Sequence, residues 1–249
     1  MSRKLRVVTL NIHKGLSQFN RRVVIHELRE GLRALEPDLV FLQEVQGLNE
    51  RHGLRYAAWP VAPQHEFLAG SDYQHVYGLN RVHQYGHYGN AVLSRFPIVS
   101  SENEDVSDHR FERRGMLHAL VKVPGWKRNL HCVCVHLSLH ERGRRRQLDA
   151  IAARLEQLIA SKMPVIVAGD FNDWRQRASG ILEKSLGMTD VAVASANAHQ
   201  RTFPSRLPLL RLDRIYARGF AVVRSEVHRG APWSLLSDHL ALSAELERD

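Results

Sequence analysis

Apolar segments of strand length recur along the whole chain, and they constrain its fold more than any other feature. Several carry apolar side chains at consecutive positions, as in LHCVCVHL and VIVAG. Successive side chains of a strand point to opposite faces, so we expect these strands to be buried on both faces. The segments are Leu5–Leu10, Asp38–Leu42, Ala91–Ser94, Leu117–Val123, Leu130–Leu137, Val165–Ala168, Arg214–Ala217, Ala221–Val227 and Leu240–Leu246.

Two further segments have helical periodicity, Val23–Leu35 and Gly143–Lys162. Strands alternate with helices in the first two thirds of the chain and follow one another near its end. This order predicts an α/β fold, a layered sandwich of mixed sheets. The stretch from Glu50 to Tyr88 is rich in Gly, His, Tyr and Pro, which predicts long loops near a site, with room for a few short strands. With 249 residues and no linker-like segment, residues 1–249 are expected to form a single domain.

The composition restricts the class of protein. Hydrophobic residues make up 44% and charged residues 24%, a balance that excludes a disordered or fibrous chain. The formal charge of +9 favours partners that carry phosphate, namely nucleic acid, anionic lipid head groups or phosphorylated small molecules. High arginine usage in the proteome would produce the same surplus, so the charge does not choose among these partners.

The termini and cysteines predict a cytoplasmic location. The N-terminus has about six apolar residues before polar ones return, fewer than the roughly 7–15 of a signal-peptide core. No stretch approaches the roughly 20 apolar residues of a membrane span. Cys132 and Cys134 stand two residues apart on one predicted strand, where their Cα atoms would lie roughly 6.5–7 Å apart. That separation predicts free thiols and a reducing compartment.

Polar residues collect where the predicted strands begin or end. Ligand sites of layered α/β proteins lie in the loops at strand ends, so this distribution indicates one polar site. Carboxylate, amide and imidazole groups are also the side chains that bind hard metal ions and transfer protons. The candidates are Asn11, Glu44, Asn90, His136, Asp170, Asn172, Asp213, Asp238 and His239.

Each candidate has a plainer explanation when it is taken alone. Glu44 at the end of LVFLQE is typical of a strand that meets water, and it becomes a metal ligand only if other oxygen ligands converge on it. Asp170 and Asn172 form either a turn or a carboxylate that acts as a general base. Because neighbouring strand residues point to opposite faces, Asp213 is a better partner than Asp238 for orienting His239.

Other residues near these motifs have alternatives of equal or greater weight. His136 shares a strand face with two cysteines, but a structural zinc site needs four ligands, so most of this face is expected to be core. The arginines from Arg142 to Arg146 begin a helix, where they form either a solvated turn or a phosphate site. Trp174 and Phe203 can stack on a base or sugar, although loop packing is the more common role.

In order along nearly the whole chain, the motifs VVTLNIHKG, LVFLQEV, YGNAVLSRFPI, CVHLSL, VAGDFNDW, RLDRIY and LSDHLAL resemble the endonuclease/exonuclease/phosphatase superfamily. The stretch RTFPSRLPLLRLDRIYARG resembles a bacterial branch of it. The resemblance implies a four-layer α/β/β/α sandwich of two mixed β-sheets flanked by helices, with the site at one end of the sheets. It also implies an Mg²⁺ cofactor, for which Mn²⁺ can substitute, and a phosphate-bearing substrate, with the protein acting as a monomer.

The resemblance implies a role for each matching residue. Glu44 matches the main metal ligand, with Asn11 and Asp238 near the metal or the scissile phosphate. Asp170 matches the carboxylate that aligns or deprotonates the attacking water. The remaining matches are Asn172 as a phosphate contact, His239 as the phosphate-facing imidazole, Asp213 as its orienting partner and His136 as a second histidine. Apart from these matches, four further residues are candidate phosphate contacts: Asn90, His13, Lys14 and Arg145.

One motif departs from the pattern of the abasic-site repair enzymes. Those enzymes have the pattern N-x-D at the first motif, where this chain has Asn11-Ile12-His13. A two-histidine phosphodiesterase therefore fits better than a repair role. Three hypotheses remain: hydrolysis of nucleic acid, hydrolysis of a phospholipid or small phosphoester, and a phosphate-binding scaffold without activity. The PLLRL segment near Leu209 is a candidate membrane-docking loop for the second, although ordinary packing also explains it. The scaffold is the least favoured, because every expected carboxylate and histidine is present.

Overall fold

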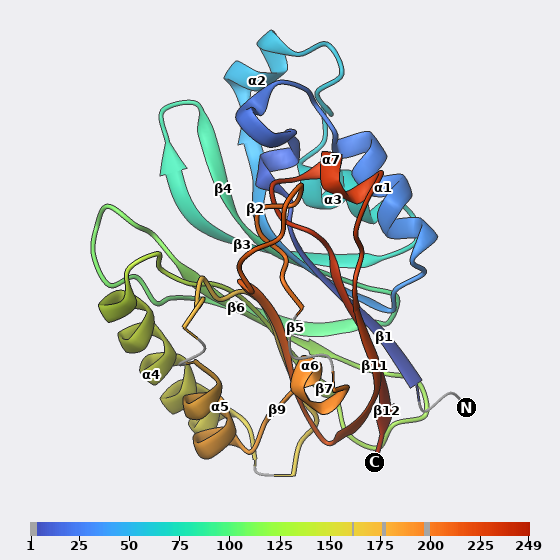
Figure 1. The fold of residues 1–249 in the computed structure, drawn as a ribbon, viewed down its shortest axis with the longest axis vertical. Helices are drawn as coiled ribbons and strands as arrows, with labels where there is room; N and C mark the ends of the chain where they lie inside the picture. Colours follow the sequence, from blue (N-terminus) through green and yellow to red (C-terminus); the bar gives the residue numbers. More distant parts are fainter. Residues whose placement is uncertain (1–3, 161, 176–177, 197–199) are drawn as a thin grey trace.

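A computed structural model describes residues 4–160, 162–175, 178–196 and 200–249 of the chain. It contains two six-stranded sheets (Figure 1). In spatial order, the first consists of β11 (Phe220–Val227), β12 (Leu242–Arg248), β1 (Lys4–Asn11), β2 (Leu39–Asn49), β4 (Gly86–Ser94) and β3 (Gln74–His83). The second consists of β5 (Ile98–Asp105), β6 (Gly115–Val121), β7 (Leu130–His136), β8 (Val165–Asp170), β10 (Asp213–Arg218) and β9 (Thr189–Asp190).

Helices cover the outer face of each sheet, as Figure 1 shows. On the first sheet lie α1 (Ile25–Ala34), α3 (Gln64–Ala69) and α7 (Trp233–Leu236). On the second lie α4 (Glu141–Leu158) and α5 (Ala178–Leu186). The shorter elements are η1 (His13–Gly15), η2 (Gln18–Asn20), α2 (Glu50–Arg55) and α6 (Val191–Ala194). The predicted four-layer sandwich is confirmed. None of the described helices is both long and apolar enough to cross a membrane.

Alternation along the central strands assigns each side chain to a layer. In β1, Val7 packs between the two sheets, whereas Val8 packs beneath α1. In β7, Cys134 faces the other sheet and Val135 faces α4. These strands are buried on both faces, as predicted, and each fully buried aliphatic side chain contributes about 1.5–3 kcal/mol to folding. Both cysteines are free and buried.

The strand pairing brings the polar strand ends together. β1 and β2 are parallel, with Asn11 in register with Gln43. β7 and β8 are also parallel, with His136 opposite Asp170. β10 runs antiparallel to β8, so its first residue, Asp213, lies opposite the last residue of β8.

Gly169 permits the close approach of β8 to β7. Its φ is +151°, and a Cβ atom at this position would lie 1.9 Å from the Val135 carbonyl oxygen. No side chain fits there, so only glycine allows this pairing directly before Asp170.

The prediction of long loops between Glu50 and Tyr88 is wrong for most of that stretch. It contains α2, α3, β3 and the start of β4. β3 is an edge strand with much of its length exposed, so it lacks the apolar pattern of a buried strand. Several predicted boundaries also move: the predicted helix at 143–162 spans Glu141–Leu158, and the strand at 38–42 extends through a bulge to Asn49.

Candidate active site

Asp170 lies at the centre of the polar cluster. Its Oδ2 atom is 3.2 Å from Asn11 Nδ2, 3.4 Å from His136 Nε2 and 3.7 Å from His239 Nε2. Its Oδ1 atom accepts a hydrogen bond from the Asn172 backbone at 3.0 Å. Burial, with repulsion from the negative charge of Asp213, raises the pKa of Asp170 to about 6. A carboxylate with a pKa near neutrality is suited to accept a proton.

His239 is held by a buried carboxylate. Its Nδ1 atom lies 2.8 Å from Asp213 Oδ2, and both side chains are almost completely buried. Burial alone would lower the pKa of the imidazole, but the charges of Asp213 and Asp170 outweigh it and raise the pKa to about 10. His239 is therefore a cation at neutral pH. The predicted contact between Asp213 and His239 is confirmed.

His136 faces the same Asp170 oxygen as His239 but differs from it in protonation state. Burial, followed by the positive charge of Arg114, holds the pKa of His136 well below its usual range. The ring is therefore neutral at neutral pH. Two histidines with different charges thus face one carboxylate, a separation of pKa values that is typical of catalytic sites.

Glu44 leaves the regular line of β2 at a bulge. The pairing of β2 with β4 shifts between Leu42 and Val45, and Glu44 has a φ of 56°. Its carboxylate lies 3.2 Å from Lys14 Nζ and 3.4 Å from Asn11 Nδ2. Burial raises its pKa, but the charge of Lys14 and of the neighbouring histidines outweighs this and lowers the pKa to about 2. The side chain is therefore anionic at every physiological pH.

The η1 loop forms one rim of the cluster. His13 Nδ1 lies 3.3 Å from Asp238 Oδ2, and the His13 backbone donates to Asn11 Oδ1 at 3.0 Å. Ser237 Oγ donates to the Asn11 carbonyl oxygen at 2.7 Å, which joins the loop before β12 to the end of β1. Asn11 thus lies beside Glu44 and Asp170, and Asp238 lies beside His13. Their role near a metal or phosphate stays a prediction.

Unusual backbone conformations concentrate at this site. In the described part of the chain, eight residues other than glycine have positive φ, and four of them are predicted site residues: His13, Lys14, Glu44 and Asn172. Such conformations cost about 1–3 kcal/mol each and persist where the surrounding structure fixes them. Their concentration here is independent support for a functional site.

Two predicted phosphate contacts, Asn172 and Asn90, use their side-chain amides to hold the backbone. Asn172 Nδ2 donates to the Leu137 carbonyl oxygen at 3.0 Å, which fixes the turn after Asp170. Asn90 is fully buried, and its Nδ2 atom donates to Gly115 at 3.1 Å and to Cys134 at 3.5 Å. Its Oδ1 atom is buried without a hydrogen-bond partner.

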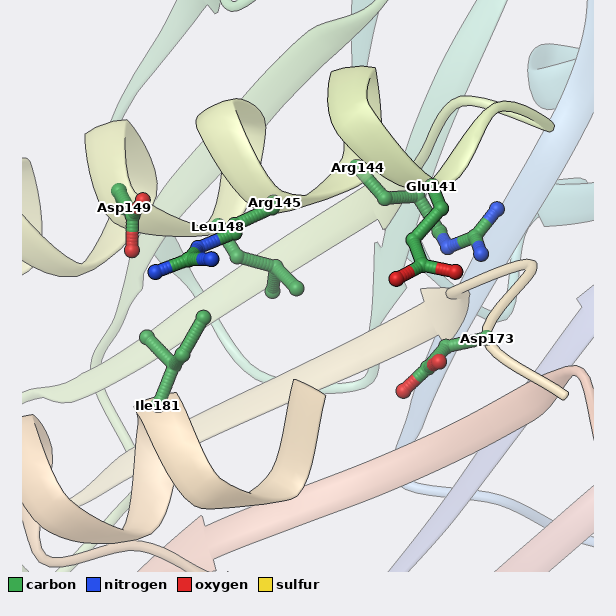
Figure 2. A pocket seen from close by; sticks show the side chains of 7 residues that line it. All are labelled: Glu141, Arg144, Arg145, Leu148, Asp149, Asp173 and Ile181. Carbon is green, nitrogen blue, oxygen red and sulfur yellow. The ribbon is translucent and has the colours of Figure 1, made fainter. Parts of the chain in front are cut away.

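The arginines of α4 lie apart from the cluster. Arg145 lines a cavity of about 240 Å³ between α4 and α5, on the side that faces Ile181 (Figure 2). Among the described residues, no contact joins it to Asp170 or Glu44. Arg144 donates to the carbonyl oxygens of Ser138 and Leu139 and lies 4.6 Å above the Trp174 ring. Packing therefore accounts for Arg144, and the role of Arg145 as a phosphate contact stays a prediction.

One supporting residue, Gln64, was not predicted, whereas Phe203 was expected to pack. The buried side chain of Gln64 donates to the Lys14 carbonyl oxygen at 2.8 Å and accepts from the Gln46 backbone at 2.9 Å. It thereby joins the η1 loop to the bulge of β2, and no sequence signal marks it. Phe203 packs its ring against that of His239, with the centroids 4.9 Å apart, so the packing alternative holds for Phe203.

Two groups of residues are possible metal ligands. Asp170, Asp213 and His239 place ligand atoms within 4.8 Å of one another. However, His239 Nδ1 already pairs with Asp213, which is the geometry of a carboxylate orienting an imidazole. The alternative is Glu44, whose buried Oε2 atom lies 3.2 Å from the Lys14 ammonium and whose Oε1 atom lies 3.4 Å from the Asn11 amide. An anionic carboxylate beside a side-chain amide fits a hard divalent cation better than an imidazole that is already paired with a carboxylate.

Comparisons with known proteins identify the family of the chain. The sequence model of the Endonuclease/Exonuclease/phosphatase family matches residues 8–239. The uncharacterized protein YbhP of Escherichia coli strain K12 is 44% identical over 244 residues, which cover 97% of this chain and 95% of YbhP.

Solved structures share the fold. An endonuclease/exonuclease/phosphatase from Bacteroides vulgatus has a TM-score of 0.78 at 18% identity, and the match covers 99% of both chains. A humanized D. rerio TDP2 has a TM-score of 0.73 at 20% identity, covering 99% of this chain and all of that one. At these identities, the likeness shows the fold alone.

Proposed function

The chain belongs to the endonuclease/exonuclease/phosphatase family, and from that premise we propose that it is a divalent-metal-dependent phosphodiesterase. Nucleic acid is the first substrate class we propose. The observation that carries the proposal is the arrangement around Asp170, a buried carboxylate faced by a cationic His239 and a neutral His136. A binding site without activity has no need for titratable groups whose pKa values are separated in this way.

Asp170 would position and deprotonate the attacking water. Its Oδ1 atom accepts from the Asn172 backbone. Its Oδ2 atom accepts from Asn11 and faces both histidines, so Oδ2 is the atom that would face a water between the two rings. The raised pKa makes Asp170 a stronger base than an exposed aspartate, yet it remains ionised near neutral pH.

His239 would stabilise the negative charge that develops on the phosphate. Its protonated ring, oriented by Asp213, can donate from Nε2 to a phosphate oxygen. Lys14 adds a second positive charge close to Glu44. Fixed cations of this kind lower the barrier because they need no reorganisation during the reaction.

Glu44 and Asn11 would hold the divalent ion, with Asp238 nearby. The lowered pKa that keeps the Glu44 carboxylate anionic, and the Asn11 amide 3.4 Å from it, support this assignment. When bound, Mg²⁺ or Mn²⁺ would supply Lewis acidity toward a phosphate oxygen.

Hydrolysis of a phospholipid or a small phosphoester is the second candidate. The chemistry would be the same. Two exposed leucines, Leu207 and Leu209, lie on the loop whose first residue, Phe203, packs against His239, and they favour a substrate at a lipid surface. The formal charge of +9 suits both substrate classes.

The test is Mg²⁺-dependent turnover by the purified protein, with Asp170→Asn as the control. The panel comprises supercoiled plasmid, single-stranded DNA, RNA, an aryl phosphodiester, inositol phosphates and phospholipid vesicles. Plasmid nicking that disappears in Asp170→Asn would support the nuclease. Activity limited to lipids or small phosphoesters would support the second candidate, and no activity on any substrate would refute both.

A further inference from the structure

A tight loop from Phe203 to Leu210 presents aliphatic side chains to solvent at the rim of the candidate site. Leu207 is 66% exposed, Leu209 55% and Leu210 36%. Scattered apolar residues are common on protein surfaces, but several in one short loop indicate an interaction surface. The proposed chemistry does not use any of the three.

The backbone of this loop is fixed by its own hydrogen bonds. The amides of Leu209 and Leu210 both donate to the Phe203 carbonyl oxygen at 2.8 Å, and the Leu207 amide donates to Pro204 at 3.1 Å. The Thr202 amide donates to the Leu210 carbonyl oxygen at 2.9 Å. Because the backbone is held in this way, the leucines cannot turn inward to the core and remain directed outward.

The loop is joined directly to the catalytic centre. Phe203, at its base, packs against the His239 ring. The Ser205 amide donates to the Asp238 carbonyl oxygen at 2.8 Å, and Ser205 Oγ donates to Ser237 at 2.7 Å and to Ser234 at 3.2 Å. The last contact brings α7 beside the loop. A surface that binds these leucines would therefore lie next to the site.

Positive charge accompanies the leucines. Arg201 precedes the loop and Arg206 lies within it, and both are exposed. Neither forms an ion pair with another residue in the described ranges. Leu235 of α7 is 42% exposed and adds a further leucine beside the loop, because Ser237, two residues later, contacts Ser205. The surface thus combines aliphatic side chains with unpaired cations.

We propose that this loop docks the protein onto an anionic lipid membrane, so that the catalytic centre works at the membrane surface. The inference goes beyond the proposed function, because it concerns where the enzyme acts and holds for either substrate class. Leucines inserted at the head-group boundary would gain burial, while Arg201 and Arg206 would be attracted to the negative charge of the anionic lipid.

A membrane fits this surface better than a macromolecular partner does. Single-stranded nucleic acid binds through aromatic stacking and hydrogen bonds, and the loop offers neither at Leu207 or Leu209. A stable protein interface buries about 800 Å² on each partner and is centred on aromatic or arginine anchors. A few leucines on one loop form a smaller, aliphatic surface, which a fluid bilayer accepts without shape complementarity.

Sedimentation of the full-length protein with vesicles tests the proposal. Vesicles of equal parts phosphatidylcholine and phosphatidylglycerol are compared with pure phosphatidylcholine. We expect the protein to bind the anionic vesicles, and the double variant Leu207→Asp/Leu209→Asp to bind at least about tenfold more weakly. The milder pair Leu207→Ser/Leu209→Ser should weaken binding in the same direction. Val99→Asp, at an exposed valine of β5, is the matched control and should bind as the wild type does.

Several results would overturn the proposal. They are absence of vesicle binding by the wild type, unchanged binding by the double variant, a concentration-dependent dimer that the double variant abolishes, and loss of plasmid binding in that variant. Turnover of a soluble aryl phosphodiester should be unchanged in the double variant. This readout separates failure of docking from failure of the proposed catalysis.

Discussion

The replacement Asp213→Asn tests whether an ion pair keeps His239 protonated. Asn preserves the shape of the side chain and its ability to accept a hydrogen bond, but it removes the negative charge that lies 2.8 Å from Nδ1. Burial disfavours the imidazolium, and in wild type the charge of Asp213 is the largest influence that opposes it. We therefore expect the pKa of His239 to fall from about 10 toward its usual value of 6.5.

The expected loss of stability follows from this shift. A pKa raised from 6.5 to about 10 corresponds to about 5 kcal/mol in favour of the charged ring. Asp170 Oδ2, which lies 3.7 Å from His239 Nε2, would still provide part of this stabilisation in the variant. We therefore expect Asp213→Asn to lower the free energy of unfolding by about 3–5 kcal/mol, the usual cost of breaking a buried pair. Because the folded state binds the proton more tightly, this contribution is complete below pH 6.5 and is lost as the pH rises through about 10.

Urea denaturation across this pH range measures the stability difference, and NMR of the imidazole protons measures the pKa of His239. Asp72→Asn is the matched control, because Asp72 also lies 2.8 Å from its cationic partner, Arg33, but both side chains are substantially exposed. That variant should lose less than about 1 kcal/mol. Equal losses in the two variants, or a neutral His239 at pH 7 in the wild type, would refute the reasoning.

Three other variants or conditions give independent predictions. Gly169→Ala should lower the free energy of unfolding by about 3 kcal/mol or more, because the new Cβ atom would clash with the Val135 carbonyl oxygen. Gly180→Ala is the control, because Gly180 lies in open space on α5, and it should raise the free energy of unfolding by about 0.5–1 kcal/mol. Urea denaturation measures both changes. Glu44→Gln should abolish Mg²⁺ binding in isothermal titration while the folded far-UV spectrum is retained, and unchanged affinity would refute Glu44 as the main ligand. The profile of kcat/KM against pH should rise as Asp170 loses its proton near pH 6, and a flat profile down to pH 5 would exclude Asp170 as the base.

The parts of the site that lie at the ends of buried strands could be predicted from sequence. Asn11, His136 and Asp170 each follow an apolar run, and parallel pairing of such runs brings their ends to one edge of a sheet. The partnership of Asp213 with His239 was also expected. Alternation along a strand does not explain it, because Asp238 and His239 precede β12 (Leu242–Arg248).

Other parts of the structure have no signal in the sequence. The bulge at Glu44 places a residue other than glycine at a positive φ, and LVFLQEV contains none of the residues that favour this conformation. It is stabilised by distant residues such as Gln64. β3 was missed because an edge strand with exposed faces needs no apolar pattern. Both cases depend on contacts between distant segments.

The charges of His136 and His239 also depend on residues that are distant in the sequence. The difference in charge indicates different roles for the two rings. The Nδ1 atom of His239 pairs with Asp213, whereas burial and the cation Arg114 both lower the pKa of His136. His136 also has a carboxylate beside it, Asp170, but its ring stays neutral, so it does not serve as a second phosphate-binding cation. A neutral His136 can instead donate from Nε2 to Asp170 Oδ2, 3.4 Å away. This arrangement favours His136 as the residue that positions the base, and His239 as the one that neutralises charge on the phosphate.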